Sequence, residues 1–79
     1  MEETPQSETR PAPTFGAVLK SCRENAELSQ VNAAKAAKVS PRAWIYWEKN
    51  ERFPLGENLA KILALFPGDR ARLTDAVGR

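Results

Sequence analysis

The side chains best suited to bind a partner lie between positions 29 and 52, and four of them fall on one side of a predicted helix. Arg42 and Tyr46 are one helical turn apart, as are Pro41 and Ile45, so two neighbouring rows point the same way. An arginine fork can donate hydrogen bonds to guanine O6 and N7, and an outward isoleucine can contact a thymine methyl group. These four residues are therefore predicted to read DNA bases. The alternatives are an ordinary charged surface at Arg42 and a stray exposed apolar residue at Ile45.

The sequence contains few of the side chains that catalysis or metal binding commonly requires. The chain contains no histidine and one cysteine, Cys22, so it has no Cys/His zinc set, no Ser/His or Cys/His pair and no intrachain disulfide. Its 79 residues build one small domain, which has little surface available to line a substrate pocket. We therefore expect a binding module and not an enzyme, with no cofactor, no metal and no small-molecule ligand.

Charge is distributed unevenly between the start of the chain and the rest. Residues 1–13 hold three glutamates, one arginine and three prolines, with no apolar residue beyond Met1 and Ala12, so we predict a disordered tail there. The remaining residues hold eleven Lys and Arg against seven Asp and Glu, a net charge of +4. This mild excess suits a polyanionic partner, although many solvated surfaces carry as much.

Hydropathy gives no sign of a membrane or an export signal. No apolar run approaches the roughly 20 residues that span a bilayer, and the first residues are acidic where a signal peptide would be basic. The sequence thus predicts a cytoplasmic protein.

Capping residues and apolar spacing predict three helices in the first part of the domain. Thr14, Ser29 and Ser40 each stand directly before a helical pattern, and Pro41 suits the first helical position. The second helix is predicted over residues 30–37 and the third over residues 41–50. The first helix presents an apolar side made of Phe15, Val18, Leu19 and Cys22.

Two further helices are predicted towards the C-terminus. Apolar residues recur between positions 55 and 66, where Pro67-Gly68 ends the pattern, and a short last helix follows from Asp69. No stretch alternates with period two for long enough to indicate a strand. The predicted fold class is therefore all-α, with four to five short helices in one domain over residues 14–79.

The second and third helices together indicate a helix-turn-helix. They are joined by a short connection, and the second is rich in alanine while the third is rich in aromatic residues. Small side chains on the second helix allow close approach, and Trp44 and Trp47 fill the shared core. Base stacking is the alternative role for the tryptophans, but their helical spacing against an apolar partner favours the core. The small side chains are Ala33, Ala34 and Ala37.

An ordered spacing connects Leu28-Ser29-Gln30, Ala34, Val39-Ser40, Trp44, Trp47-Glu48, Pro54 and Leu59. This pattern, within residues 15–66, resembles the Cro/C1-type (XRE-like) helix-turn-helix of phage repressors and their bacterial relatives. The resemblance implies a five-helix, lambda-repressor-like domain that forms homodimers. It also implies that the helix over residues 41–50 inserts into the major groove of a palindromic double-stranded DNA operator.

The resemblance further implies which residues hold the DNA backbone. The family places a phosphate-binding glutamine at the start of the second helix, here Gln30, next to the cap Ser29. The loop after the third helix flanks the groove in this family. Further phosphate contacts are predicted there, at Lys49, Asn50 and Arg52.

Two structural features also follow from the resemblance. Glu48 corresponds to a glutamate that pairs with a basic residue on the first helix, here Arg23. Family members usually carry glycine where this chain has Glu27 and Lys38, and a longer aliphatic residue where it has Ala33. If residues 27 and 38 take a positive φ, each costs about 1 kcal/mol.

A two-fold dimer surface is predicted from apolar residues near the C-terminus: Leu65, Phe66, Leu73, Ala76 and Val77. The alternative is that these residues only complete the core of the monomer.

The leading interpretation is a sequence-specific DNA-binding transcriptional regulator, a homodimeric repressor that occludes a promoter. One alternative is an antitoxin or a regulator of a mobile-element operon, of the anti-CRISPR-associated or restriction-controller type, which a neighbouring gene would distinguish. Another is a protein-interaction module that kept the fold but not the DNA.

Overall fold

Five α-helices and one 3-10 turn build the part of the chain that the structure, a computed structural model, describes: residues 13–77. In chain order they are α2 (Phe15–Asn25), α3 (Gln30–Ala37), α4 (Pro41–Glu48), α5 (Glu57–Leu65), η1 (Pro67–Asp69) and α6 (Arg70–Ala76). No strand occurs within this range, so the predicted all-α class is confirmed. The predicted tail, residues 1–13, lies outside the described residues except for Pro13.

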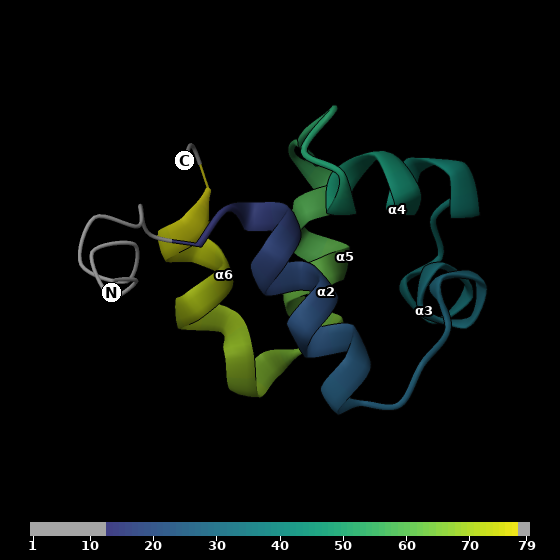
Figure 1. Cartoon of the computed structure of the whole chain (residues 1–79), viewed down its shortest axis with the longest axis horizontal. Helices are drawn as coiled ribbons and strands as arrows, with labels where there is room; N and C mark the ends of the chain where they lie inside the picture. The colour runs from purple at the N-terminus through teal and green to yellow at the C-terminus, as the bar shows by residue number, and fades with distance from the viewer. Residues whose placement is uncertain (1–12, 78–79) are drawn as a thin grey trace, which may run out of the picture.

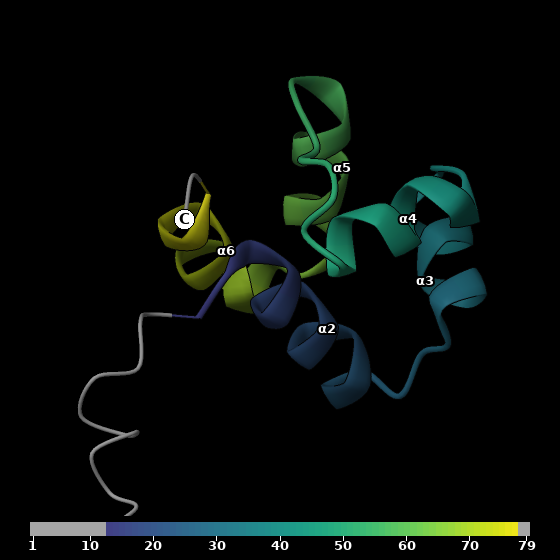
Figure 2. The same ribbon diagram turned by 45° about the horizontal axis from the view of Figure 1, so that its top comes forward.

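The helices are arranged with α3 and α4 at one end of the molecule and α6 at the other (Figure 1). Between these ends lie α2 and α5, and the turned view keeps the same order (Figure 2). The helix α2 packs against α4 and α6, and α3 packs against α4 and α5. This arrangement leaves α4 at an edge, with one side against the core and one side open.

Side-chain caps set where the first three helices begin. The hydroxyl of Thr14 accepts the backbone N–H of Ala17 at 3.2 Å, and the hydroxyls of Ser29 and Ser40 accept the equivalent N–H groups at 3.0 and 3.1 Å. Each bond satisfies one of the N–H groups that a helix start leaves without a partner. The three predicted start positions are confirmed.

The same three helices end at residues with a left-handed backbone. Glu27, Lys38 and Asn50 follow α2, α3 and α4 with φ of 59°, 62° and 62°. Such a backbone costs a residue with a Cβ about 1 kcal/mol, and asparagine tolerates it best. Asn50 also explains why α4 ends at Glu48 and not at the predicted position 50, because a left-handed residue cannot continue a helix.

Two tryptophans occupy the centre of the hydrophobic core. Trp44 is 0% exposed and Trp47 is 4% exposed. The ring of Trp44 lies 6.2 Å from that of Trp47 and 6.4 Å from that of Phe66. The predicted core role of both tryptophans is confirmed. The small side chains of α3 are buried in the same core, as predicted: Ala33, Ala34 and Ala37.

The C-terminal residues predicted to form a dimer surface mostly belong to this core. Leu73, Ala76 and Phe66 are 0%, 1% and 6% exposed within one chain, so their side chains offer almost no surface to a second copy. That part of the prediction is wrong because α6 packs back against α2 with its apolar side inward. The alternative, completion of the monomer's core, is observed. Leu65 is half-buried and Val77 is exposed, so these two stay accessible.

Candidate nucleic-acid interface

The open side of α4 carries the residues predicted to read bases. Pro41 and Arg42 are exposed, and Ile45 and Tyr46 are half-buried. At 3.6 residues per turn, Arg42 lies opposite the buried tryptophans, with Ile45 and Tyr46 on either side of it. The structure therefore brings the four residues to one accessible surface. We call this surface, Pro41, Arg42, Ile45 and Tyr46, the outer face of α4.

The inner side of α4 is fixed to its neighbours through one carboxylate. Glu48 accepts two hydrogen bonds from the guanidinium of Arg23 on α2, at 2.6 Å from Nε and 3.2 Å from Nη2. It also accepts the indole N–H of Trp44 at 2.6 Å and an amide N–H of Gln30 on α3 at 3.0 Å. The predicted pairing of Glu48 with Arg23 is confirmed, and this one carboxylate links α2, α3 and α4.

The same contacts control the protonation of Glu48. Burial raises the pKa of its carboxyl group, but the hydrogen bonds from Arg23, Gln30 and Trp44 and the charge of Arg23 together lower it by more. The pKa therefore lies below its ordinary value of 4.5, and Glu48 is ionised at neutral pH. The positive charge of Arg23 balances the negative charge of this carboxylate on the inner side of α4.

The start of α3 lies beside this carboxylate. Gln30 is half-buried, and its bond to Glu48 uses one of its two amide N–H donors. Ser29 is exposed and uses its hydroxyl to cap the helix. Both residues stand at a helix N-terminus, where free backbone N–H groups favour an anion. The phosphate contacts of Ser29 and Gln30 stay predictions.

Asn50 has a structural role that sequence reasoning missed. Its Oδ1 accepts the backbone N–H of Gly16 at 2.9 Å, and its Nδ2 donates to Oγ1 of Thr14 at 3.0 Å. Both ends of the amide group therefore tie the loop after α4 to the start of α2. The phosphate contact of Asn50 stays a prediction, because its bond to Thr14 uses one of its two amide N–H donors. An asparagine directly after a helix can indicate a left-handed end. No local pattern indicates its partners, which lie far away in the sequence.

The start of α2 lies directly against the end of α4. A Cβ atom at Gly16 would clash with the backbone carbonyl oxygen of Glu48 and would lie 2.7 Å from that of Trp47. Only glycine permits so close an approach of one backbone to another. The end of α4 is therefore held by α2 as well as by its own loop.

The loop beyond α4 adds positive charge beside the outer face. Lys49 and Arg52 are both exposed. The guanidinium carbon of Arg52 lies 5.1 Å from the centroid of the Tyr46 ring. The next residue, Phe53, packs its ring at 5.9 Å from that of Phe15 on α2. Sequence reasoning missed the contact between Arg52 and Tyr46, because it depends on the path of the loop.

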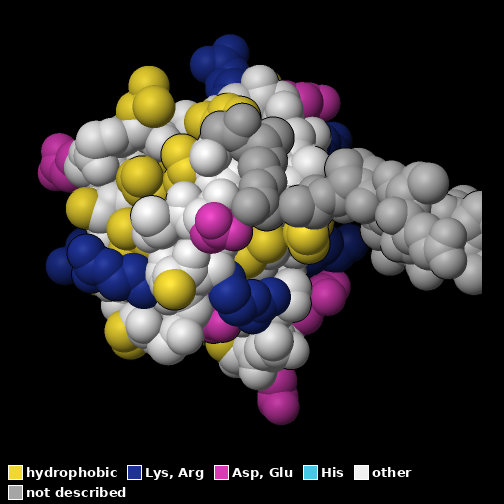
Figure 3. Space-filling view, turned by 90° about the vertical axis from the view of Figure 1, so that its left-hand side faces the viewer, with side chains coloured by type: hydrophobic (Ala, Val, Ile, Leu, Met, Phe, Trp, Pro, Cys, Tyr) yellow, Lys and Arg dark blue, Asp and Glu magenta, His cyan; other side chains and the backbone are white. Residues whose placement is uncertain are grey.

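The far end of the molecule has a different character. The face on the α6 side carries Lys and Arg side chains scattered among Asp, Glu and apolar ones (Figure 3), which is a poor match for a polyanion.

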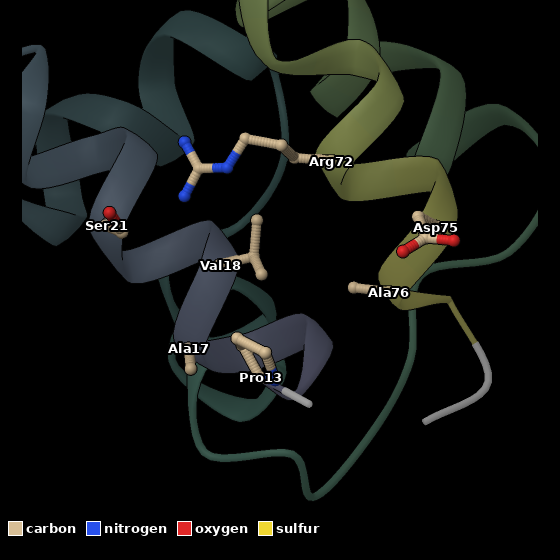
Figure 4. Close-up of a pocket in the computed structure, with 7 residues that line it drawn as sticks. All are labelled: Pro13, Ala17, Val18, Ser21, Arg72, Asp75 and Ala76. Atoms are coloured by element: carbon tan, nitrogen blue, oxygen red, sulfur yellow. The ribbon is translucent and has the colours of Figure 1, made fainter. Parts of the chain in front are cut away.

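A cavity of about 370 Å³ lies between α2 and α6 (Figure 4). Arg72 at its edge forms an ion pair with Asp69 at 2.9 Å. The cavity is lined by Pro13, Ala17, Val18, Ser21, Arg72, Asp75 and Ala76.

Residues 13–77 contain neither a membrane-spanning helix nor a cluster of metal ligands. None of the helices in this range is long and apolar enough to cross a membrane. Nor does this range bring three His, Cys, Asp or Glu side chains together where they could hold a metal ion.

Comparison with known proteins places the chain in no family. No protein-family model, no curated protein and no solved structure matches it. The resemblance to Cro/C1-type domains accordingly rests on the residue pattern within residues 15–66 alone.

Proposed function

We propose that this chain is a sequence-specific DNA-binding transcriptional regulator, a cytoplasmic homodimeric repressor that places α4 in the major groove of each half of a palindromic operator. The observation that carries the proposal is the outer face of α4. It offers an arginine, a tyrosine and an isoleucine on one accessible side, while Glu48 fixes the other side to α2 and α3. Base edges are read by hydrogen bonds of strict geometry, so a reading helix must be held rigidly.

Each part of the surface has a role in this proposal. Arg42 donates to guanine O6 and N7, and Ile45 contacts a thymine methyl group. Gln30 and the free N–H groups at the start of α3 hold one backbone phosphate, and Lys49 holds another. Asn50 acts indirectly, because it fixes the loop that follows α4.

The proposed dimer makes a geometric demand on the operator. Two copies of α4 must enter successive major grooves on one face of the DNA, which sets the half-site centres about 10 base pairs apart. Inserting about five base pairs between the half-sites puts them on opposite faces and is expected to abolish paired binding. Sedimentation with and without operator measures the stoichiometry. A monomer that binds one asymmetric half-site and tolerates the insertion would contradict the dimer.

Selection of bound sequences from random double-stranded DNA tests the function directly. An enriched palindrome is expected. Arg42→Ala should then weaken operator binding by about 1–3 kcal/mol and relax preference at one base position per half-site. Arg70→Ala is the matched control, because Arg70 is an exposed arginine on α6, at the far end of the molecule. No enrichment at low salt would contradict the proposal.

A second candidate function is a protein-interaction module with the same fold. It is favoured by Leu55, which is 78% exposed in the loop before α5, and by Phe53, which is 38% exposed two residues earlier. Neighbouring exposed apolar side chains are a feature of protein contact surfaces. The same selection separates the two functions, because an interaction module enriches no DNA sequence.

A further inference from the structure

We infer that Tyr46 is a positioning residue and not a base reader: its ring is the platform that orients the guanidinium of Arg52 towards one phosphate of the DNA backbone. This inference rests on the proposed function, because it assigns roles to two residues of the same surface. It replaces the base-reading role predicted for Tyr46 and leaves that role to Arg42 and Ile45.

The contact with the ring leaves the donors of Arg52 available. The guanidinium carbon lies 5.1 Å from the ring centroid, within the distance of about 6 Å at which an aromatic face attracts a cation. The ring attracts the charge as a whole, so the five N–H donors of the guanidinium stay free for an acceptor. Over residues 13–77 no carboxylate pairs with Arg52, and the neighbouring Glu51 is exposed. Arg52 is therefore ordered without losing its capacity to bind an anion.

The loop that carries Arg52 is fixed on both sides. Before it, the side chain of Asn50 is tied to the start of α2. The backbone N–H of Glu51 donates to the carbonyl oxygen of Tyr46 at 3.0 Å. After it, the ring of Phe53 packs against that of Phe15. The left-handed turn at Asn50 reverses the chain, which brings Arg52 back over Tyr46. Because this geometry exists before DNA arrives, less conformational entropy is lost on binding.

The position of the pair favours a phosphate over a base. The helix α4 ends at Glu48, and Arg52 lies in the loop beyond it. When a helix occupies a major groove, the segments beyond its ends meet the groove walls, where the sugar-phosphate backbone runs. Arginine suits a phosphate in this place because it can present two parallel N–H donors to it.

Four variants test the pair: Tyr46→Phe, Tyr46→Leu, Arg52→Gln and the double variant Tyr46→Leu/Arg52→Gln. Fluorescence anisotropy measures Kd on the selected operator and on a random duplex, from about 50 to 200 mM salt. Circular dichroism confirms that each variant is folded. Arg70→Gln is the matched control, because it removes the same charge from α6.

The expected pattern differs between the two residues. Tyr46→Phe leaves Kd unchanged, because a ring without its hydroxyl is still a platform. Arg52→Gln weakens binding to both duplexes about tenfold and lowers the salt slope by about one per subunit. Tyr46→Leu weakens binding about threefold, in line with an exposed cation–π contact. The double variant is no weaker than Arg52→Gln alone, and Arg70→Gln behaves like the unmodified protein.

Two binding results would overturn the inference. One is a loss of operator preference in Tyr46→Phe with unchanged affinity for the random duplex, because the hydroxyl would then read a base. The other is a double variant in which the losses of the single variants multiply, because Tyr46 and Arg52 would then act independently.

A measurement on the free protein tests the platform without DNA. The side-chain methylene protons of Arg52 should resonate upfield in the NMR spectrum because of the Tyr46 ring current, and Tyr46→Leu should remove this shift. Unshifted protons in the unmodified protein would overturn the inference. If the unmodified protein binds neither duplex, the proposed function fails and the phosphate contact fails with it. If the unmodified protein binds DNA but the losses of the two single variants multiply in the double variant, only the inference about Tyr46 and Arg52 fails.

Discussion

Replacing Glu48 by glutamine removes the charge that joins α2, α3 and α4 while keeping the size of the side chain. The carboxylate accepts four N–H donors, two of them from Arg23 and one each from Gln30 and Trp44. Glutamine keeps one acceptor oxygen and turns an NH₂ group towards donors that need an acceptor. Arg23, whose side chain is only 12% exposed, then keeps its charge without its main partner.

The expected loss is about 3 kcal/mol in the free energy of unfolding. Removing one partner of a buried ion pair typically costs about 3–5 kcal/mol, and the retained oxygen offsets part of this. Solvent screens the pair weakly, because the side chain of Glu48 is 4% exposed. A domain of this size is stable by about 5 kcal/mol, so the variant loses more than half of its stability.

The same variant changes how stability depends on pH. The pKa of Glu48 in the folded protein lies below 4.5, so the unfolded chain binds this proton more tightly. The contribution of the carboxylate to stability is therefore complete above about pH 5 and is lost as the pH falls through the ordinary value to the folded pKa. Below about pH 5, the unfolding free energy should fall more steeply in the unmodified protein than in Glu48→Gln.

Urea denaturation followed by tryptophan fluorescence measures both effects, because Trp44 and Trp47 are buried in the folded protein and meet solvent on unfolding. Glu24→Gln is the matched control. Its carboxylate lies 4.0 Å from Arg23 but is 58% exposed, so its loss should leave the midpoint unchanged. A loss below about 1 kcal/mol in Glu48→Gln, or equal pH slopes in the two proteins, would refute the reasoning.

Gly16→Ala should lower the free energy of unfolding by about 2 kcal/mol or more, because its Cβ meets the backbone of α4. Gly68→Ala, where a Cβ meets nothing within 4 Å, is the control in thermal denaturation, and equal melting temperatures would contradict the close approach. Lys38→Gly should stabilise by about 1 kcal/mol by relieving a positive φ, whereas Lys35→Gly inside α3 should destabilise by a similar amount. Leu73→Asp should unfold the chain, as seen by circular dichroism, and a folded monomer would show that this residue is not in the core.

Local patterns account for the parts of the fold that sequence reasoning predicted. Thr14, Ser29 and Ser40 cap helices through bonds that span three residues, so the relevant atoms are neighbours in the chain. The core role of Trp44 and Trp47 follows from their spacing on one helix. The ion pair between Arg23 and Glu48 joins two helices, and only the resemblance to a known family indicated it.

The parts that sequence reasoning could not predict depend on how helices meet. An apolar row such as that of Leu73 and Ala76 serves a monomer core or a dimer surface equally well, and only the docking of α6 decides between them. A polar side chain such as Asn50 can face a ligand or a distant part of the same chain. Its partners here are 34 and 36 residues away, beyond the reach of any local pattern.

The contact between Asn50 and the start of α2 also bears on the order of folding. Closing a loop of this length costs more chain entropy than forming the α3–α4 hairpin, whose helices are adjacent in sequence. We expect α3 and α4 to pair before the folding transition state and the Asn50 contact to form after it. The kinetic φ-value of Asn50, which is the change in the folding barrier divided by the change in stability, should then be near zero. Asn50→Ala should then speed unfolding while leaving the folding rate unchanged in stopped-flow chevron measurements. The residue that secures the end of α4 would thus govern how long the folded state lasts and not how fast it is reached.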